Sequence, residues 1–355
     1  PQQGVCSTPF VEGDRLYYTS NQAKIVALDV AGLKNGNEGV TDEKETSPTD
    51  GDVIWSFDLM GEADVFPHNL AASSPLVVDG ILYATTGNGV DEGHVNIPSP
   101  LAPSFVAIDQ KTGKLVWESA EPGSKIIHGN WSNAAYGVVK GKPQVVFGGG
   151  DGWVYSFEPK TGKLIWKFDA NPKDAVYRLG GSGTKNDIIA TPVVYDDKVF
   201  IGVGQDPEHG EGVGNFWVID ATMEGDVTGK AVVWKRGGDE FHRTISTVAI
   251  HEGIVYAADL SGFLYALDQK TGALYWKHDM LAAVWASPLV ADGKIYLGDE
   301  DGDVAVLAVG KTKKLLSEMN MGSAVYATVY PKGGVLYILA RNRLFAIKDG
   351  AKAAR

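Results

Sequence analysis

The sequence contains a single cysteine, Cys6, among 355 residues. One cysteine excludes an internal disulfide, a cysteine-based metal site and the cysteine pair that attaches a c-type haem. Positive charge is also scarce, and the net charge of −12 argues against a nucleic-acid partner, because phosphates need a basic surface. Since no apolar run reaches about eighteen residues, we expect no transmembrane segment.

Helical periodicity of useful length is missing as well, and a short recurring phrase takes its place. The phrase combines a strand, a turn that ends in Thr-Gly, and a strand that closes on Trp. Its clearest copies are Phe105–Trp117, Val154–Trp166 and Phe263–Trp276. In all three, a small residue precedes the Trp by ten positions: Ala107, Ser156 and Ala266. Short β-branched and aromatic runs between Gly and Asp turns are typical of strands.

Together with two shorter apolar strands before it, the phrase defines a four-stranded unit that occurs seven times. The copies start near residues 8, 74, 133, 191, 247, 287 and 327. Copies without insertions are about 40 residues apart, which is the period of a β-propeller blade. We therefore predict an all-β chain in which residues 1–355 form a single β-propeller domain with seven four-stranded blades and a loop insert at 30–50.

The seventh copy stops before its fourth strand, which would leave a strand edge exposed. We expect a strand ahead of Pro1 to complete this blade, and a whole additional blade there would raise the number to eight. Since the chain starts at Pro1 rather than Met, we interpret it as a mature or an incomplete chain, and we expect that an export signal has been removed.

The repeated Trp predicts how blades are fastened together. An indole can lie across a neighbouring turn only where the facing residues are small, and Ala and Thr-Gly leave that room. Copy six places Leu316 where the Trp is expected. The residues predicted to dock blades in this way are Trp55, Trp117, Trp166, Trp234 and Trp276.

The pattern Ala-x-Asp-x-x-Thr-Gly-x-x-x-Trp resembles the tryptophan-docking motif of quinoprotein propellers. From Cys6 to Ile347 the chain resembles a PQQ-binding-like β-propeller repeat protein, a bacterial family that is usually exported, which implies a periplasmic or extracellular location. The resemblance also implies PQQ and Ca²⁺ as candidate cofactors. The family's alcohol dehydrogenases have a vicinal Cys–Cys disulfide, and their haem-linked members a Cys-x-x-Cys-His motif. A chain with Cys6 alone has neither, so we expect no quinoprotein catalysis.

Propeller topology places the D-to-A and B-to-C connections of the blades on one face, and nearly all the long loops of this chain are of those kinds. Polar and aromatic residues of these loops are the candidates for binding a ligand or partner. They are His68, His94, His128, Asp187, His209, His242, Arg243, Trp285 and Tyr326. All histidines except His251 are expected in or beside these loops.

Two interpretations of these histidines stay open. A loop histidine is most often a hydrogen-bonding anchor, but several imidazoles could also surround a transition metal. The insert Asp206–Gly212 adds Glu208, His209 and Glu211 as weaker metal or acid–base candidates. The acidic insert 36–52 is predicted to be a solvated, mobile loop.

The functional hypothesis is an exported propeller that binds another protein or a small ligand through its loop-rich face, without catalysis of its own. The alternatives are a PQQ- or metal-dependent oxidoreductase and a sensor or carbohydrate-binding propeller.

Overall fold

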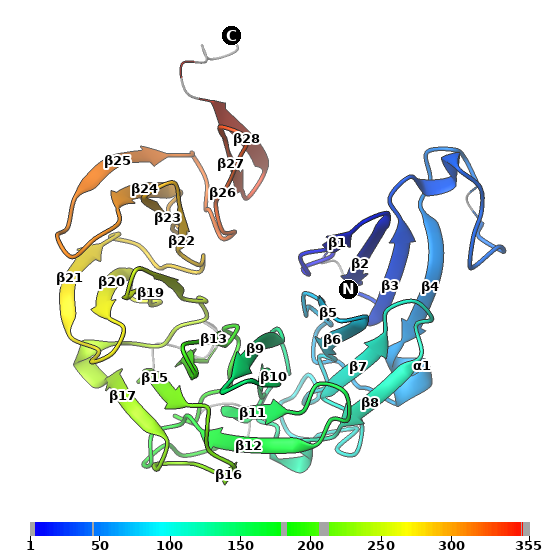
Figure 1. The fold of residues 1–355 in the computed structure, drawn as a ribbon, viewed down its shortest axis with the longest axis horizontal. Helices are drawn as coiled ribbons and strands as arrows, with labels where there is room; N and C mark the ends of the chain where they lie inside the picture. Colours follow the sequence, from blue (N-terminus) through cyan, green and yellow to red (C-terminus); the bar gives the residue numbers. More distant parts are fainter. Residues whose placement is uncertain (1–3, 45, 179–182, 206–212, 349, 351–355) are drawn as a thin grey trace. The chain divides into compact units, whose positions relative to one another are not determined.

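The computed structural model describes residues 4–44, 46–178, 183–205, 213–348 and 350. Within them the protein is a β-propeller of seven blades, each a sheet formed by consecutive strands (Figure 1), which confirms the predicted fold class. Helical structure in this part of the chain is confined to α1 (Leu59–Ala63) and the 3-10 turns η1 (Gly32–Lys34), η2 (Gly123–Lys125) and η4 (Gly238–Glu240).

The chain divides into two compact units. Unit 1 comprises residues 1–198 and 221–231, and unit 2 comprises residues 199–220 and 232–355. Unit 1 therefore holds the first three blades, and unit 2 holds the last three and most of the fourth.

The three blades of unit 1 are antiparallel sheets in chain order. The first consists of β1 (Phe10–Glu12), β2 (Arg15–Thr19), β3 (Lys24–Asp29) and β4 (Asp52–Asp58). The second consists of β5 (Leu76–Val78), β6 (Ile81–Thr85), β7 (Phe105–Asp109) and β8 (Leu115–Ser119). The third consists of β9 (Ala135–Val139), β10 (Lys142–Gly148), β11 (Trp153–Phe157) and β12 (Leu164–Asp169), and β16 (Gly225–Asp226) adds to it parallel to β12.

The remaining blades repeat this order. The fourth has β13 (Val193–Tyr195), β14 (Lys198–Val203), β15 (Asn215–Asp220) and β17 (Val232–Gly237). The fifth has β18 (Ala249–His251), β19 (Ile254–Ala258), β20 (Phe263–Asp268) and β21 (Leu274–Asp279). The sixth has β22 (Leu289–Ala291), β23 (Lys294–Gly298), β24 (Asp303–Ala308) and β25 (Leu315–Asn320). The seventh has three strands, β26 (Tyr330–Lys332), β27 (Val335–Ala340) and β28 (Arg343–Lys348).

Local sequence accounts for the hairpins and for the late start of each first strand. Asp79 and Gly80 both have positive φ, as a tight two-residue hairpin between β5 and β6 requires. The first strand begins two residues after the predicted start of the copy in blades one to six and three residues after it in blade seven. The Ser/Thr-Pro pairs thus precede the strands, because Pro has no N–H to give to the sheet.

The small residue of the repeated phrase lies directly opposite the Trp. Ala107 pairs with Trp117, Ser156 with Trp166 and Ala266 with Trp276, and a bulge follows the small residue each time. In blade six the residue in the Trp position, opposite Val306, is Ser317. The expectation of Leu316 was wrong by one residue.

Indoles connect each of four blades to the next. In each case the ring N–H donates to a backbone carbonyl of the following sheet. The bonds are Trp55 to Gln110 at 3.0 Å, Trp117 to Pro159 at 2.6 Å, Trp234 to Gln269 at 2.9 Å and Trp276 to Gly310 at 2.9 Å. The core of unit 1 accordingly lies between consecutive sheets, with one cluster joining blades one and two and another joining blades two and three.

Blade three departs from this pattern. Trp166 is fully buried and donates to the Gln144 side chain of its own sheet at 2.9 Å. The Gln144 amide nitrogen in turn donates to the Ala221 carbonyl at 3.1 Å. Gln144 therefore makes the bond to the following segment that an indole makes elsewhere.

The insert after β3 is held more firmly than the sequence indicated. The Val40 N–H donates to the Val53 carbonyl at 2.9 Å, and the Glu38 N–H donates to the buried Asp52 carboxylate at 3.2 Å. Arg15 contacts Glu38 at 3.0 Å. These contacts tie residues 38 and 40 of the insert to β2 and β4, whereas most of its described residues are exposed, as expected for a solvated loop.

Candidate functional site

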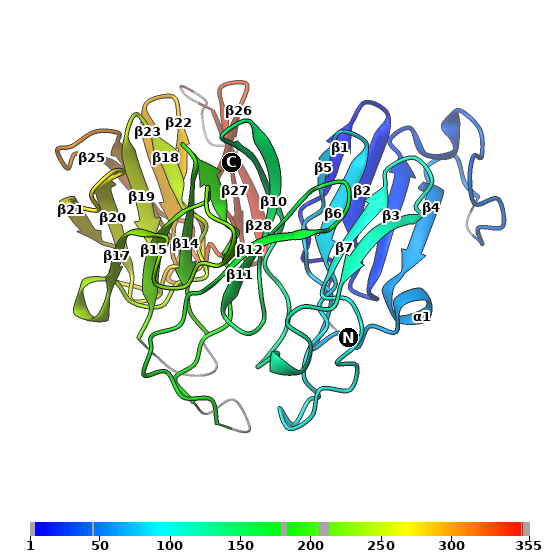
Figure 2. The same cartoon turned by 60° about the horizontal axis from the view of Figure 1, so that its bottom comes forward.

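Three long loops of unit 1 meet at one end of its strands. They are residues 59–75 between β4 and β5, residues 86–104 between β6 and β7, and residues 120–134 between β8 and β9. Isolated bridges join Pro67 to Asn88 and Gly89 to Gly129, so the loops are paired with one another. We call this the long-loop end of unit 1, and it includes α1 at the end of β4 (Figure 2).

Each of these loops contributes one histidine to a compact cluster. His68, His94 and His128 each offer a ring nitrogen, and these nitrogens lie within 4.8 Å of one another. The Nε2 atoms of His68 and His128 are 3.1 Å apart. The three ring centroids are separated by 4.7, 4.6 and 4.8 Å, so the imidazoles form a nearly regular triangle. His68 and His128 are buried, and His94 is half-buried.

Buried amide side chains fix the loops beneath the cluster. The Asn88 side chain accepts from the Phe66 N–H at 3.1 Å and donates to the Ser99 carbonyl at 3.0 Å. Asn130 donates to the Asn88 carbonyl at 2.7 Å and accepts from the Gly150 N–H at 2.8 Å. Because both asparagines are fully buried, this frame holds the loops in one arrangement.

Two glycines allow the loops to approach this closely. A Cβ on Gly89 would lie 2.6 Å from the His68 Cβ and 2.6 Å from the His128 carbonyl oxygen. A Cβ on Gly129 would lie 2.6 Å from the Trp131 ring. The contact between the His68 and His128 imidazoles therefore depends on the absence of side chains at these positions.

The outer nitrogens of two rings face fixed groups. His68 Nδ1 lies 2.8 Å from the Val90 carbonyl oxygen, to which it can only donate. His128 Nδ1 lies 3.9 Å from a carboxylate oxygen of the buried Asp187. The Trp131 ring packs edge-on against His128 at 4.6 Å. This surrounding shell fixes the orientation of both rings.

His94 is held by the turn that precedes it. The Asp91 carboxylate accepts from the Val95 and Asn96 N–H groups at 2.8 and 3.2 Å, and the His94 N–H donates to the Asp91 carbonyl at 2.9 Å. These bonds to the Val95 and Asn96 N–H groups hold the pKa of Asp91 below its ordinary value. His94 itself has a φ of +54°, an unusual backbone conformation that the turn imposes.

Chemically, the cluster is a set of nitrogen donors. Among the described residues it is the one group of three or more histidine, cysteine or acidic side chains whose ligand atoms converge in this way. Imidazole suits zinc, copper, iron and nickel, whereas Ca²⁺ needs oxygen ligands. With Cys6 as the single cysteine, the residues present do not fit a Ca²⁺–PQQ centre of the dehydrogenase type.

The other candidates described by the structure lie in unit 2. His242 Nδ1 is 3.2 Å from the buried Asp259 carboxylate, which also accepts from the Tyr265 hydroxyl at 2.7 Å. Burial and the Asp259 charge raise the pKa of Tyr265. Arg243 is buried, and its carbonyl accepts from the Leu260 N–H at 2.9 Å. These contacts resemble loop anchoring more than an open binding site.

An aromatic pair forms the last candidate group. The rings of Trp285 and Tyr326 are 5.1 Å apart, and the Tyr326 hydroxyl lies 3.4 Å from the Glu300 carboxylate. Glu208, His209 and Glu211 fall in 206–212, outside the described residues. From the predicted set, the structure brings together His68, His94, His128 and Asp187 in unit 1, and Trp285 and Tyr326 in unit 2.

His278 lies in β21 opposite Leu264, next to the last residue of that strand, and therefore beside the following loop rather than within it. The fourth strand continues past the Trp, and the second residue after the Trp points inward, where blades one and three have Phe57 and Phe168. Burial lowers the pKa of His278.

Exposed apolar side chains also occur on the long-loop end of unit 1. Leu101 is 89% exposed. Others on the same connections and on residues 170–178 are Met60, Phe66, Val95, Val176 and Tyr177.

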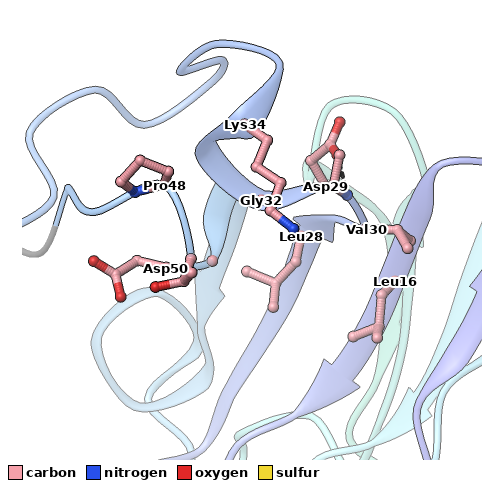
Figure 3. Close-up of a pocket in the computed structure, with 11 residues that line it drawn as sticks. Leu16, Leu28, Asp29, Val30, Gly32, Lys34, Pro48 and Asp50 are labelled. Carbon is pink, nitrogen blue, oxygen red and sulfur yellow. Dashed lines mark hydrogen bonds between the residues drawn. The ribbon is translucent and has the colours of Figure 1, made fainter.

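A pocket of about 340 Å³ lies at the opposite end of blade one, beneath the insert. Figure 3 shows Leu16, Leu28 and Val30 on one side of it and Pro48 and Asp50 on the other. The nearby Asp29 carboxylate accepts from Arg15 at 2.6 Å and from the Ala31 N–H at 2.6 Å. The Asp29 carboxylate is thus engaged with β2 and with the start of the insert.

Comparison with known proteins identifies the family to which this chain belongs. A family model described as outer membrane protein assembly factor BamB matches residues 45–214 and 218–348. Among individual relatives, the chain is 26% identical to a tetrathionate hydrolase of Acidithiobacillus ferrooxidans over 284 residues. That match covers 74% of this chain and 51% of the hydrolase, so the chain spans about half the length of this relative.

Two further comparisons cover nearly the whole chain. An outer membrane protein assembly factor BamB of Moranella endobia is 22% identical over 334 residues, which is 93% of this chain and 68% of that protein. The crystal structure of BamB from Moraxella catarrhalis has a TM-score of 0.64 at 15% identity, covering 99% of this chain and 85% of that one. This likeness shows a shared fold. Within the described residues, no helix has the length and apolar character needed to cross a membrane.

Proposed function

Because two matched segments cover most of its length, the chain belongs to the family described as outer membrane protein assembly factor BamB, and from that premise we propose that it is an exported module that binds another protein. Docking would use the long-loop end of unit 1. The family description supports a role within an assembly, and the wide, rigid surface of a propeller suits that role.

The main support for this proposal is that the long-loop end of unit 1 combines rigid loops with exposed apolar side chains. The bridges and buried asparagines fix the backbone of the loops. Leu101, Phe66 and Val95 nevertheless point their side chains toward solvent. Exposed apolar groups on a fixed frame are typical of interaction surfaces, because little conformational entropy is lost when a partner covers them.

In-cell crosslinking tests the proposal directly. A photoreactive amino acid is placed at Leu101 or, as a matched control, at Val138, which is 58% exposed on β9 away from the loops. We expect a discrete crosslinked protein from position 101 and none from position 138, and we expect Phe66→Ser to reduce the yield. Equal crosslinking from both positions, or a monomer that crosslinks to nothing, would contradict the proposal.

The oxidoreductase alternative has its own test. The purified protein is mixed with PQQ, Ca²⁺ and an artificial electron acceptor, and alcohol and sugar oxidation is followed. We expect no turnover, because the single Cys6 and the nitrogen donors at the loop end do not provide the dehydrogenase site. Turnover would replace the binding proposal with a catalytic one.

A further inference from the structure

We propose that His68, His94 and His128 form a mononuclear site for a first-row transition metal ion, with Zn²⁺ as the expected occupant. The inference goes beyond the proposed binding function and does not depend on it. It rests on the distances between the imidazoles, on the groups that orient them and on the loop frame that brings them together.

The donor spacing is close to what a metal requires. Zinc–nitrogen bonds of about 2.0–2.1 Å in a tetrahedral site place neighbouring nitrogens roughly 3.3 Å apart. The Nε2 atoms of His68 and His128 are already 3.1 Å apart. The largest separation within the set is 4.8 Å, so a modest rotation of the half-buried His94 closes the triangle.

The hydrogen-bonding roles of the two rings are compatible with an ion between them. His68 donates from Nδ1 to the Val90 carbonyl at 2.8 Å, so in the neutral ring the Nε2 lone pair faces His128. Without a metal, His128 can donate from Nε2 to that lone pair across the 3.1 Å separation. A cation bound by both Nε2 atoms replaces this hydrogen bond, and the His128 proton then lies on Nδ1, which faces the Asp187 carboxylate at 3.9 Å.

The second coordination shell has the form that metal-bound histidines usually show. Ligating imidazoles donate their other N–H to a carbonyl or carboxylate, which fixes the tautomer and the ring orientation. The Val90 carbonyl occupies that place for His68. The Asp187 carboxylate lies 3.9 Å from His128 Nδ1, and a shift of about 1 Å would bring it within hydrogen-bond distance. Asp187 is therefore a positioning residue for His128 rather than a ligand.

The loops are organised for the site before any ion binds. Gly89 and Gly129 let two backbones cross, and Asn88 and Asn130 lock that crossing in the interior. With three side-chain ligands, the coordination sphere keeps a fourth position for water or a small anion. Of the three imidazoles, that of His94 is the most exposed to solvent.

The competing explanation is a hydrogen-bonded pair of structural histidines with His94 packed beside them. In that case the cluster stabilises the loops but has no preference for metal over solvent. Metal affinity and coordination spectroscopy separate the two explanations, since a structural pair gives neither stoichiometric binding nor a ligand-field signal.

The test uses the full chain purified without a polyhistidine tag, stripped with a chelator and titrated with Zn²⁺ or Co²⁺ alone. We expect one equivalent of either ion per chain and the intense visible absorption of four-coordinate Co²⁺. Binding should be lost in His94→Ala, whose half-exposed loop tolerates the change, and in His128→Ala. It should weaken by about 10–100-fold in Asp187→Asn, the range typical for a partner of a metal-bound histidine.

The matched control is His251→Ala, on β18 in unit 2 and far from these loops in sequence, which should bind as the parent does. Circular dichroism on each variant verifies that the sheets are intact. Less than about a tenth of an equivalent bound to the parent protein would overturn the proposal. So would parental affinity in folded His94→Ala and His128→Ala, or an equal loss in His251→Ala.

Discussion

Replacing Gly162 by Ala tests the physical basis of blade docking. Gly162 belongs to the Thr-Gly turn of blade three, and the indole of Trp117 from blade two covers it. A Cβ on Gly162 would lie 2.6 Å from the Trp117 ring, and the residue has a φ of +67°. Ala here therefore incurs both backbone strain and a steric clash.

The chain contains a matched control for the backbone strain. Gly229 occupies the corresponding Thr-Gly turn of blade four, in unit 1 like Gly162, with a φ of +71°, and a Cβ added there would meet no atom within 4 Å. Left-handed backbone costs an Ala about 1–2 kcal/mol, and overpacking adds about 1–3 kcal/mol. Gly229→Ala should thus cost about 1–2 kcal/mol, and Gly162→Ala about 2–5 kcal/mol.

Urea unfolding of the full-length variants, followed by tryptophan fluorescence and circular dichroism, measures both losses of unfolding free energy. The difference between them is the steric cost of placing a methyl group against the Trp117 indole, and Trp117→Phe should reduce it because a smaller ring leaves room for the methyl group. If the two alanine variants are equally stable to within about 0.5 kcal/mol, the indole does not clamp the turn and the reasoning fails.

Three further changes probe other parts of the molecule. Burial raises the pKa of Asp151 from 3.8 to about 6. Between about pH 4 and pH 6 the folded protein therefore keeps a proton on Asp151 that the unfolded chain has lost. The stability of the folded protein falls as pH rises through this window. At about 1.4 kcal/mol per pH unit, the parent protein loses about 3 kcal/mol of unfolding free energy across this window. In urea unfolding from pH 4 to 8, Asp151→Asn should abolish this pH dependence. A variant with the same pH profile as the parent would contradict the assignment to Asp151. Gln144→Ala should cost about 1–3 kcal/mol of unfolding free energy, because the buried Trp166 N–H loses its acceptor. If the variant is as stable as the parent in urea unfolding, the hydrogen bonds of Gln144 do not contribute to stability. Gly89→Ala should weaken Co²⁺ binding at least tenfold in a spectroscopic titration, whereas Gly93→Ala in the same loop meets ordinary contacts at 3.7 Å and should not; equal affinities would show that the loop crossing does not set the site.

The fold could be predicted because its causes are local and repeated. A small residue opposite a Trp, followed by Thr-Gly, determines a strand pair and a docking contact within fourteen residues, and the structure places Ala266 opposite Trp276 accordingly. The error at Leu316 arose because the turn before it is one residue longer, so that Ser317 occupies the expected Trp position. This is a change of register, which composition does not reveal.

The candidate site could be predicted only as a set of loops. His68, His94 and His128 share no spacing signature, and their convergence depends on bridges between loops that are far apart in sequence. His242 has the same position in its repeat as His128, seven residues before the first strand, yet it contacts Asp259 instead. The missed signal is the pair Gly89 and Gly129, since glycines in long loops can mark a backbone crossing.

Trp55 and Trp117 each dock onto the next blade along the chain, and this has a consequence for folding during synthesis. Trp55 finds its carbonyl acceptor in the second repeat and Trp117 finds its own in the third. The indole of a newly synthesised repeat therefore stays exposed until its acceptor has been made, which is 55 residues later for Trp55 and 42 residues later for Trp117. Translation would then set the order of assembly from the N-terminal side, and a pause between repeats would prolong the interval in which that ring can attract chaperones or aggregate.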